Sequence, residues 1–149
     1  MRAGMTQILR DTQFWQAVIA ALLFWTIAYL WFTPQIDWAW PLHQPREVLY
    51  LVLIYPLVEE LLFRGVLQGY LLKRPALKQD IVGLTGANLL TSFIFTGLHF
   101  LMHPPLAAAA VIVPSLIFGH FRDRFGTLHA PIMLHIYYNL GYFWIFASQ

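Results

Sequence analysis

Long apolar runs dominate the chain, and its few charged residues divide these runs into segments of helical length. No charged residue occurs between Asp11 and Asp37, between Asp80 and Arg122, or after Arg124. Each of these intervals is long enough for at least one membrane-spanning helix of about 20 residues. The pattern therefore predicts an all-α fold, a polytopic membrane helix bundle with about five transmembrane helices. The predicted spans are residues 13–33, 48–72, 82–103, 105–121 and 127–147.

The composition also indicates a membrane protein. Of the 149 residues, 59% are hydrophobic and only 11% are charged, which is more apolar surface than a soluble domain of this size buries in one core. The sequence has no cysteine, which excludes disulfides, a thiol nucleophile and a cysteine metal site. Since no linker-like or repeated segment divides the chain, we expect a single membrane-embedded domain over residues 1–149.

Basic residues indicate which helix ends face the cytoplasm. If the five predicted spans alternate in direction, seven basic residues outside the spans fall on one side of the membrane and only Arg46 falls on the other. The positive-inside rule then places the N-terminus in the cytoplasm. The formal charge of +2 therefore reflects membrane orientation and does not indicate a nucleic-acid partner. The basic residues on the predicted cytoplasmic side are Arg2, Arg10, Lys73, Arg74, Lys78, Arg122 and Arg124.

Three ionisable residues lie inside the second predicted span: Glu59, Glu60 and Arg64. A charged side chain at mid-bilayer costs at least about 2.5–3.5 kcal/mol on insertion scales, so such residues usually mark a functional site. Glu60 and Arg64 are four residues apart and are expected to form an ion pair on one helix face. Glu59 lies about 100° around the helix and is left without that partner. Pro56, three residues earlier, removes a helix hydrogen bond and permits a kink beside the carboxylates.

Two further predicted spans carry polar side chains. His99 lies four residues after Phe95 and close to Gly97, where a small residue is expected to let another helix approach. His135 and Asn139 are four residues apart and share a face of the last span. Two carboxylates, an arginine, two histidines and an asparagine on three helices exceed what helix association requires.

This set of side chains suits hydrolysis. Without an activated serine or cysteine, a protease needs a metal ion or a positioned general base to activate water. A desolvated glutamate such as Glu59 supplies a base, and the side chains of His135 and Asn139 supply hydrogen-bond donors for a developing oxyanion. Ser115 has no lysine or histidine near it in sequence and is not expected to act as a nucleophile. His103, before Pro104 at the end of a helix, is expected to cap that helix or to face water.

The three sequence patterns resemble the motifs of the CPBP family of intramembrane proteases, the CAAX protease and bacteriocin-processing group, also called the Abi family. The EExxxR motif is matched by Glu59 to Arg64, FxxxH by Phe95 to His99, and HxxxN by His135 to Asn139. The order and the spacing both fit, and the similarity covers about residues 52–142.

The resemblance implies an intramembrane endopeptidase of a bacterial cytoplasmic membrane. In this interpretation Glu59 is the general base on a water molecule also held by His99, and His135 with Asn139 stabilises the oxyanion. Glu60 and Arg64 would maintain the geometry. Implied substrates are prenylated CAAX-type proteins, C-terminal sorting or anchor segments, and peptide precursors. No cofactor is expected.

Three alternatives stay open at the level of sequence. One is a zinc-dependent version of the same protease, which is less favoured because the chain has no HExxH pair. Another is a non-catalytic immunity or scaffold protein that keeps the polar network for assembly. The last is a small transporter with Glu59 and Glu60 as a proton relay, although the expected internal symmetry is not visible.

Overall fold

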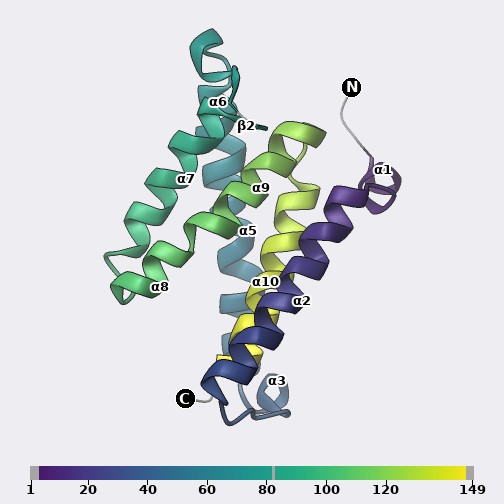
Figure 1. Cartoon of the computed structure of the whole chain (residues 1–149), viewed down its shortest axis with the longest axis vertical. Helices are drawn as coiled ribbons and strands as arrows, with labels where there is room; N and C mark the ends of the chain where they lie inside the picture. The colour runs from purple at the N-terminus through teal and green to yellow at the C-terminus, as the bar shows by residue number, and fades with distance from the viewer. Residues whose placement is uncertain (1–3, 82, 147–149) are drawn as a thin grey trace.

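The computed structural model describes residues 4–81 and 83–146, which form a bundle of helices (Figure 1). The α-helices are α1 (Met5–Leu9), α2 (Thr12–Phe32), α3 (Trp40–His43), α4 (Pro45–Glu47), α5 (Tyr55–Glu60), α6 (Gly69–Leu71), α7 (Gly86–His99), α8 (Pro105–Ala110), α9 (Ile112–Phe125) and α10 (His129–Phe146). Two π-helical segments, η1 (Val48–Ile54) and η2 (Leu61–Gln68), and one 3₁₀ turn, η3 (Pro75–Leu77), complete the helical structure. A two-residue antiparallel pair joins β1 (Asp80–Ile81) to β2 (Leu84–Thr85).

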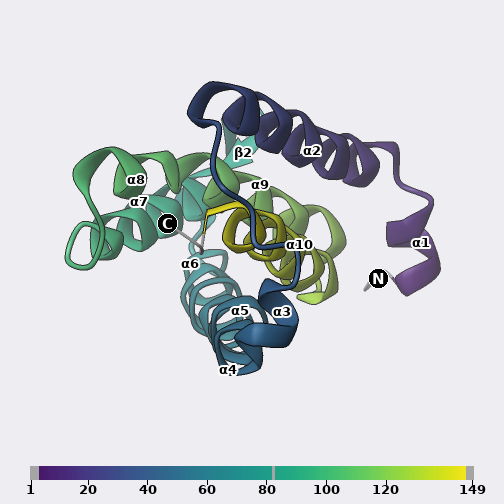
Figure 2. The same cartoon turned by 90° about the horizontal axis from the view of Figure 1, so that it is seen from below.

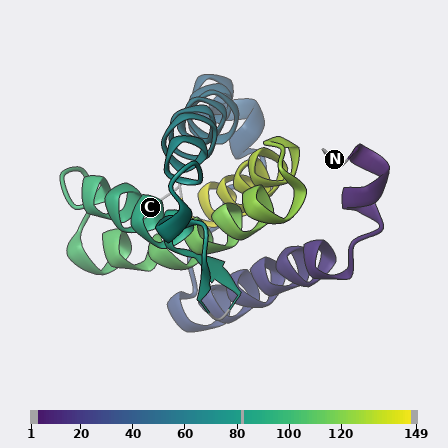
Figure 3. The same ribbon diagram turned by 90° about the horizontal axis from the view of Figure 1, so that it is seen from above.

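Helix α10 occupies the centre of the bundle. It packs against α9, α2, η1 and α5, while α7 packs against α9 and η2. Figure 2 shows α10 surrounded by these elements, with α2 on the side away from α5, and Figure 3 shows the same arrangement from the opposite end. The three segments that carry the sequence motifs are thus brought around one region of the bundle.

Helix boundaries follow local capping chemistry. The Asp11 side chain accepts a hydrogen bond from Phe14 N–H and begins α2. The Thr85 hydroxyl accepts from Asn88 N–H and begins α7. Helix α9 ends at Phe125, and the Gly126 that follows has a φ of 67°, the left-handed conformation that glycine adopts without a Cβ penalty.

The prediction of an all-α fold is confirmed, whereas the number of transmembrane helices is supported only in part. Two helical stretches, Thr12–Phe32 and Pro105–Phe125, are long and apolar enough to cross a membrane. The predicted span 82–103 is too long, because the β1–β2 hairpin and the Thr85 cap delay the start of α7, which has 14 residues. The helical run from Val48 to Leu71 contains the charged EExxxR residues and therefore lacks the uniform apolar character of a simple membrane span.

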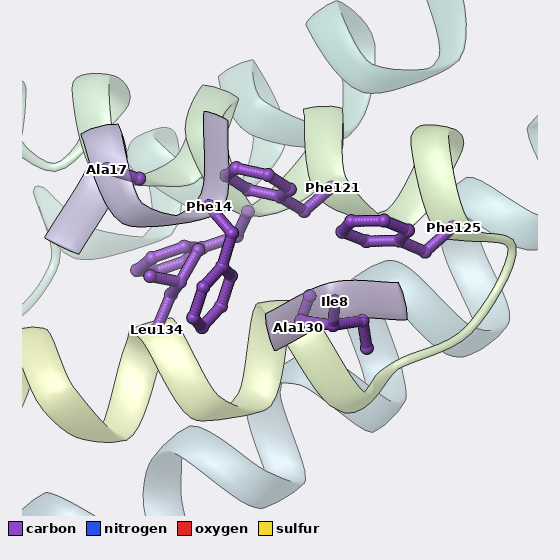
Figure 4. Close-up of a cluster of buried hydrophobic side chains, with 8 residues drawn as sticks. Ile8, Phe14, Ala17, Phe121, Phe125, Ala130 and Leu134 are labelled. Carbon is purple, nitrogen blue, oxygen red and sulfur yellow. The ribbon is translucent and has the colours of Figure 1, made fainter. Parts of the chain in front are cut away.

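The apolar core lies where α1 and the beginning of α2 meet α9 and α10. Figure 4 shows the aromatic rings of this cluster between the helices. The rings of Phe121 and Phe125 are stacked with centroids 5.8 Å apart, and those of Phe14 and Phe121 meet edge to face. Leu134 belongs to the same cluster and precedes the motif residue His135, so core packing determines the orientation of α10 at the site. The cluster consists of Ile8, Phe14, Ala17, Phe118, Phe121, Phe125, Ala130 and Leu134.

Gly119 allows the close approach of α9 to α7. A Cβ at this position would overlap the Asn88 side chain, whose Nδ2 donates to Leu116 O at 3.0 Å. The predicted role of Gly97 in helix approach is wrong, because nothing lies within 4 Å of where its Cβ would be. The small residue that α7 and α9 need is on α9, since it is the Asn88 side chain of α7 that projects into the contact.

Candidate active site

The predicted ion pair of the EExxxR motif is present. Arg64 Nε lies 3.5 Å from Glu60 Oε2, and both side chains are fully buried. Glu60 Oε1 accepts a hydrogen bond from His135 Nδ1 at 2.8 Å, which joins α5 to α10. The second motif glutamate approaches the same ring, with Glu59 Oε2 3.6 Å from His135 Nε2. His135 therefore lies between the two carboxylates, one on each side of its ring.

Arg64 is also held by α9. Its Nη2 donates to Ser115 O at 2.9 Å and to Ser115 Oγ at 2.7 Å. The guanidinium carbon lies 5.4 Å from the centroid of the Phe95 ring, within the range of a cation–π contact. A buried guanidinium is stable only when its donors and its charge are compensated, and these contacts supply part of that compensation.

Ring packing restricts the orientation of His135. Phe118 stacks on its imidazole with ring centroids 4.8 Å apart and an interplanar angle of 25°. Phe95 meets the same imidazole edge to face at 6.2 Å. Apolar rings around the imidazole strengthen the hydrogen bond to Glu60 by excluding water.

Glu59 differs from Glu60 in the solvent exposure of its side chain. Its side chain keeps 32% of its surface accessible, whereas that of Glu60 keeps none. Glu59 and His99 line one pocket of about 230 Å³, which is large enough for water and part of a peptide. The other lining residues are Phe63, Phe95, Leu98, Met102 and His103.

The tautomer of His99 follows from its backbone contact. Its Nδ1 lies 2.9 Å from Phe95 O, and a carbonyl oxygen only accepts, so Nδ1 carries the hydrogen. In the neutral ring, Nε2 is then an acceptor. An acceptor in the pocket of Glu59 suits a water molecule that donates to His99.

Asn139 contacts the backbone of the neighbouring helix. Its Nδ2 donates to Leu51 O at 2.8 Å, which joins α10 to η1. The other five predicted site residues, Glu59, Glu60, Arg64, His99 and His135, are linked by direct contacts, by a shared pocket or by the Phe95 ring between them. The structure thus brings the predicted residues to one region, with Asn139 one turn of α10 beyond His135.

Within residues 4–81 and 83–146, no group of three or more His, Asp or Glu side chains is arranged to hold a metal ion. The carboxylates of Glu59 and Glu60 are instead directed at the imidazole of His135.

Comparison with known proteins gives a family. The protein-family model of the Type II CAAX prenyl endopeptidase Rce1-like proteins matches residues 41–141, which is more than half of the chain. The chain belongs to this Rce1-like family. No curated protein and no solved structure matches it. The match agrees with the CPBP resemblance of the three sequence motifs, all of which fall within it.

Membership of the Rce1-like family supports a CAAX-type intramembrane protease. It also implies a membrane-associated protein substrate and a location in a membrane. In this Rce1-like chain, Glu60 and Arg64 form a fully buried ion pair, whereas Glu59 and His99 line a pocket.

Two residues near the site were not predicted from the sequence. His103 lines the pocket, and its ring stacks on that of His99 with centroids 5.5 Å apart, although it was expected to cap a helix or to face water. The four-residue spacing of His99 and His103 is the sequence signal that could have identified it. Ser115 holds Arg64, and no local pattern identifies it, because its partner is 51 residues away.

Proposed function

We propose that this chain is an intramembrane endopeptidase that uses Glu59 to activate water for attack on a peptide bond of a membrane-associated protein. One observation carries the proposal: Glu59 lies in a pocket with His99 and within 3.6 Å of His135, while its neighbour Glu60 is buried in an ion pair. Two adjacent glutamates thus have different environments, which suits one for chemistry and the other for structure.

The reaction begins with a water molecule between Glu59 and His99 Nε2. Glu59 takes one proton while the water oxygen forms a bond to the carbonyl carbon, and the carbonyl π electrons move to the oxygen. Protonated Glu59 then gives the proton to the amide nitrogen as the C–N bond breaks, which yields a carboxylic acid and an amine. The oxyanion accepts a hydrogen bond from His135 Nε2, provided that both nitrogens of this ring carry hydrogen.

The buried residues maintain this arrangement. Glu60 accepts from His135 Nδ1 and so orients the ring, and Arg64 neutralises the Glu60 carboxylate. Ser115 in turn holds the guanidinium of Arg64. Positioning of this kind is a large part of enzymatic rate enhancement because the groups need not reorganise during the reaction.

The apolar walls of the pocket favour a substrate peptide that lies in the membrane. Phe63, Leu98 and Met102 give the pocket apolar sides next to the polar groups, which suits an extended peptide that enters from the membrane. We propose the C-terminal segment of a membrane-anchored protein as substrate, with prenylated CAAX-type proteins as the first class to test. Sorting or anchor segments and peptide precursors are the other classes.

The experiment is cleavage of membrane-anchored peptides by the purified protein in liposomes. Glu59→Gln should lower kcat by about 10²–10⁴-fold, the usual contribution of a general base, without loss of folding. Glu47→Gln, at an exposed residue just before the same helical run, is the matched control. Its amide oxygen can still accept the hydrogen bond from Trp40 Nε1, so this variant should keep full activity. Full activity in Glu59→Gln overturns the assignment of the base. A folded wild-type protein that cleaves no class of membrane peptide favours a non-catalytic role.

A further inference from the structure

Pro56 leaves one backbone carbonyl of its helix without a helical donor. In an α-helix the N–H of residue 56 would donate to Val52 O, and in the wider π register it would donate to Leu51 O. Proline has no N–H, so one of these two carbonyls lacks its partner whichever register the helix adopts. A buried carbonyl left without a hydrogen bond costs about 1–3 kcal/mol, so another donor is required.

The register of this segment shows which carbonyl is affected. Residues Val48–Ile54 are π-helical, and Tyr55 N–H donates to Tyr50 O, five residues back. The Tyr55 N–H therefore does not donate to Leu51 O, which would be its acceptor in an α-helix. The next donor in the π register would be residue 56, which is Pro56. The vacancy falls on Leu51 O.

Asn139 of α10 fills this vacancy. Its Nδ2 donates to Leu51 O at 2.8 Å, and η1 packs against α10 over this region. Four residues earlier on α10, His135 Nδ1 binds Glu60 Oε1. The two motif residues of α10 thus hold the same helical run on both sides of Pro56, one before the proline and one after it.

The glutamates lie directly after this held segment. Pro56 is three residues before Glu59, so the direction of the helix after the proline determines where the Glu59 and Glu60 carboxylates point. The Asn139 bond holds the segment before the proline against α10, while the bond between His135 and Glu60 holds the segment after it.

We infer that Asn139 is a positioning residue that replaces the missing N–H of Pro56 at Leu51 O and thereby holds Glu59 in place for catalysis. This inference, which rests on the proposed function for its catalytic part, differs from the oxyanion role that the family resemblance implies. In that role Asn139 would contact substrate, and the identity of residue 56 would not affect its contribution.

A double-mutant cycle tests the inference. Asn139→Ala should lower kcat by about tenfold, equivalent to about 1.4 kcal/mol, with a smaller change in KM. In Pro56→Ala the backbone regains an N–H, so adding Asn139→Ala to this variant should cost much less than it costs in the wild type. Pro75→Ala, in the exposed η3 turn, is the matched control, and its effect should multiply with that of Asn139→Ala.

Melting temperatures of the same variants supply a readout that does not depend on peptidase activity. The loss caused by Asn139→Ala should be largely rescued by Pro56→Ala. If the wild type cleaves no peptide while this rescue occurs, the proposed function fails and the backbone role of Asn139 stands. If the single variant fails to fold, the isosteric Asn139→Asp, which removes the donor, is compared in both backgrounds.

The outcomes separate the two roles of Asn139. Smaller losses in the Pro56→Ala background, in activity or in folding, support the positioning role. Losses of kcat that multiply in the cycle, or variants that fail to fold in both backgrounds, overturn it. Losses of kcat that multiply would mean that Asn139 acts by contacting the substrate rather than by its hydrogen bond to Leu51 O.

Discussion

Ser115 holds Arg64 with both its carbonyl oxygen and its hydroxyl group, at 2.9 and 2.7 Å from the same guanidinium nitrogen. Both residues are fully buried, and they come from helical segments far apart in the sequence. This contact extends the polar chain from His135 through Glu60 and Arg64 to α9, so a hydroxyl that touches no carboxylate contributes to the geometry of the site.

Ser115→Ala should therefore lower both stability and activity. Loss of one hydrogen bond to a buried charged group costs about 1.5–3 kcal/mol of unfolding free energy. The guanidinium of Arg64, which then keeps only the backbone carbonyl of residue 115 as its acceptor on α9, should shift Glu60 and lower kcat severalfold. Ser92→Ala is the control, because the buried Ser92 hydroxyl donates to Asn88 Oδ1 and is not part of the polar network of His135, Glu60 and Arg64. Both variants should melt earlier, and only Ser115→Ala should lose kcat per folded molecule. Equal kcat in the two variants would contradict the prediction.

The two adjacent glutamates should differ when each is changed to glutamine. Glu60→Gln leaves Arg64 buried without its counter-charge, and breaking such a pair costs about 3–5 kcal/mol. Glu59→Gln should affect folding little, because that side chain keeps 32% of its surface accessible. Thermal unfolding in detergent, measured in parallel with cleavage, checks the contrast. Equal melting temperatures in the two variants would refute it.

Gly119→Ala should disrupt the contact between α7 and α9. The added Cβ overlaps the Asn88 side chain, which is buried and hydrogen-bonded to Leu116 O, so the helices must move apart. Gly97→Ala is the matched control, because its Cβ meets nothing within 4 Å. We expect a lower melting temperature and a smaller folded yield for Gly119→Ala, and values no lower than wild type for Gly97→Ala. A Gly119→Ala protein as stable as wild type would show that this contact is not tight.

Acid should weaken the contact between the start of α2 and the end of α9. Burial raises the pKa of Asp11, but hydrogen bonds from Arg124 and Phe14 N–H outweigh it and leave the pKa below the ordinary 3.8. A carboxyl group with a lowered folded-state pKa stabilises the protein above its unfolded-state pKa, and this stability is lost as pH falls through the folded-state pKa. Asp11→Asn should therefore melt earlier at neutral pH and lose less stability below pH 3.8. Parallel melting curves over this range would contradict the prediction.

Removal of metal should leave the peptidase activity unchanged. In the proposed reaction the water is activated by Glu59 and held by His99, and no step uses a metal ion. Strong chelators should therefore not lower the rate of cleavage, and elemental analysis should find no stoichiometric zinc. Loss of activity that zinc restores would favour the zinc-dependent version of the protease.

Several features of the site could be predicted because they depend on residues close in sequence. The i,i+4 spacing of Glu60 and Arg64 predicted their ion pair, and the long uncharged apolar runs placed His99 and His135 on helices. The start of α7 could not be predicted in this way. The Thr85 hydroxyl caps the helix and so begins it at Gly86. Leu84, the apolar residue before Thr85, belongs to the short β1–β2 pair, although the sequence predicted that it would be helical.

Contacts between distant residues account for the rest. Nothing near Ser115 in the sequence indicates that it holds Arg64, and the π register before Pro56 has no simple sequence signature. The close approach of another helix was likewise predicted at Gly97, whereas the structure shows it at Gly119. These features depend on which helix faces turn toward each other.

The sequence alone predicted that the chain is helical, that it belongs in a membrane, and which three segments carry the motifs of its family, because these properties follow from the length of the uncharged apolar runs and from the cost of charges in lipid. Only the tertiary structure decided which glutamate is buried and which faces a pocket, and that Asn139 binds Leu51 O. The physical reason is that desolvation and hydrogen-bond partners come from neighbouring helices, whose packing is a property of the whole chain.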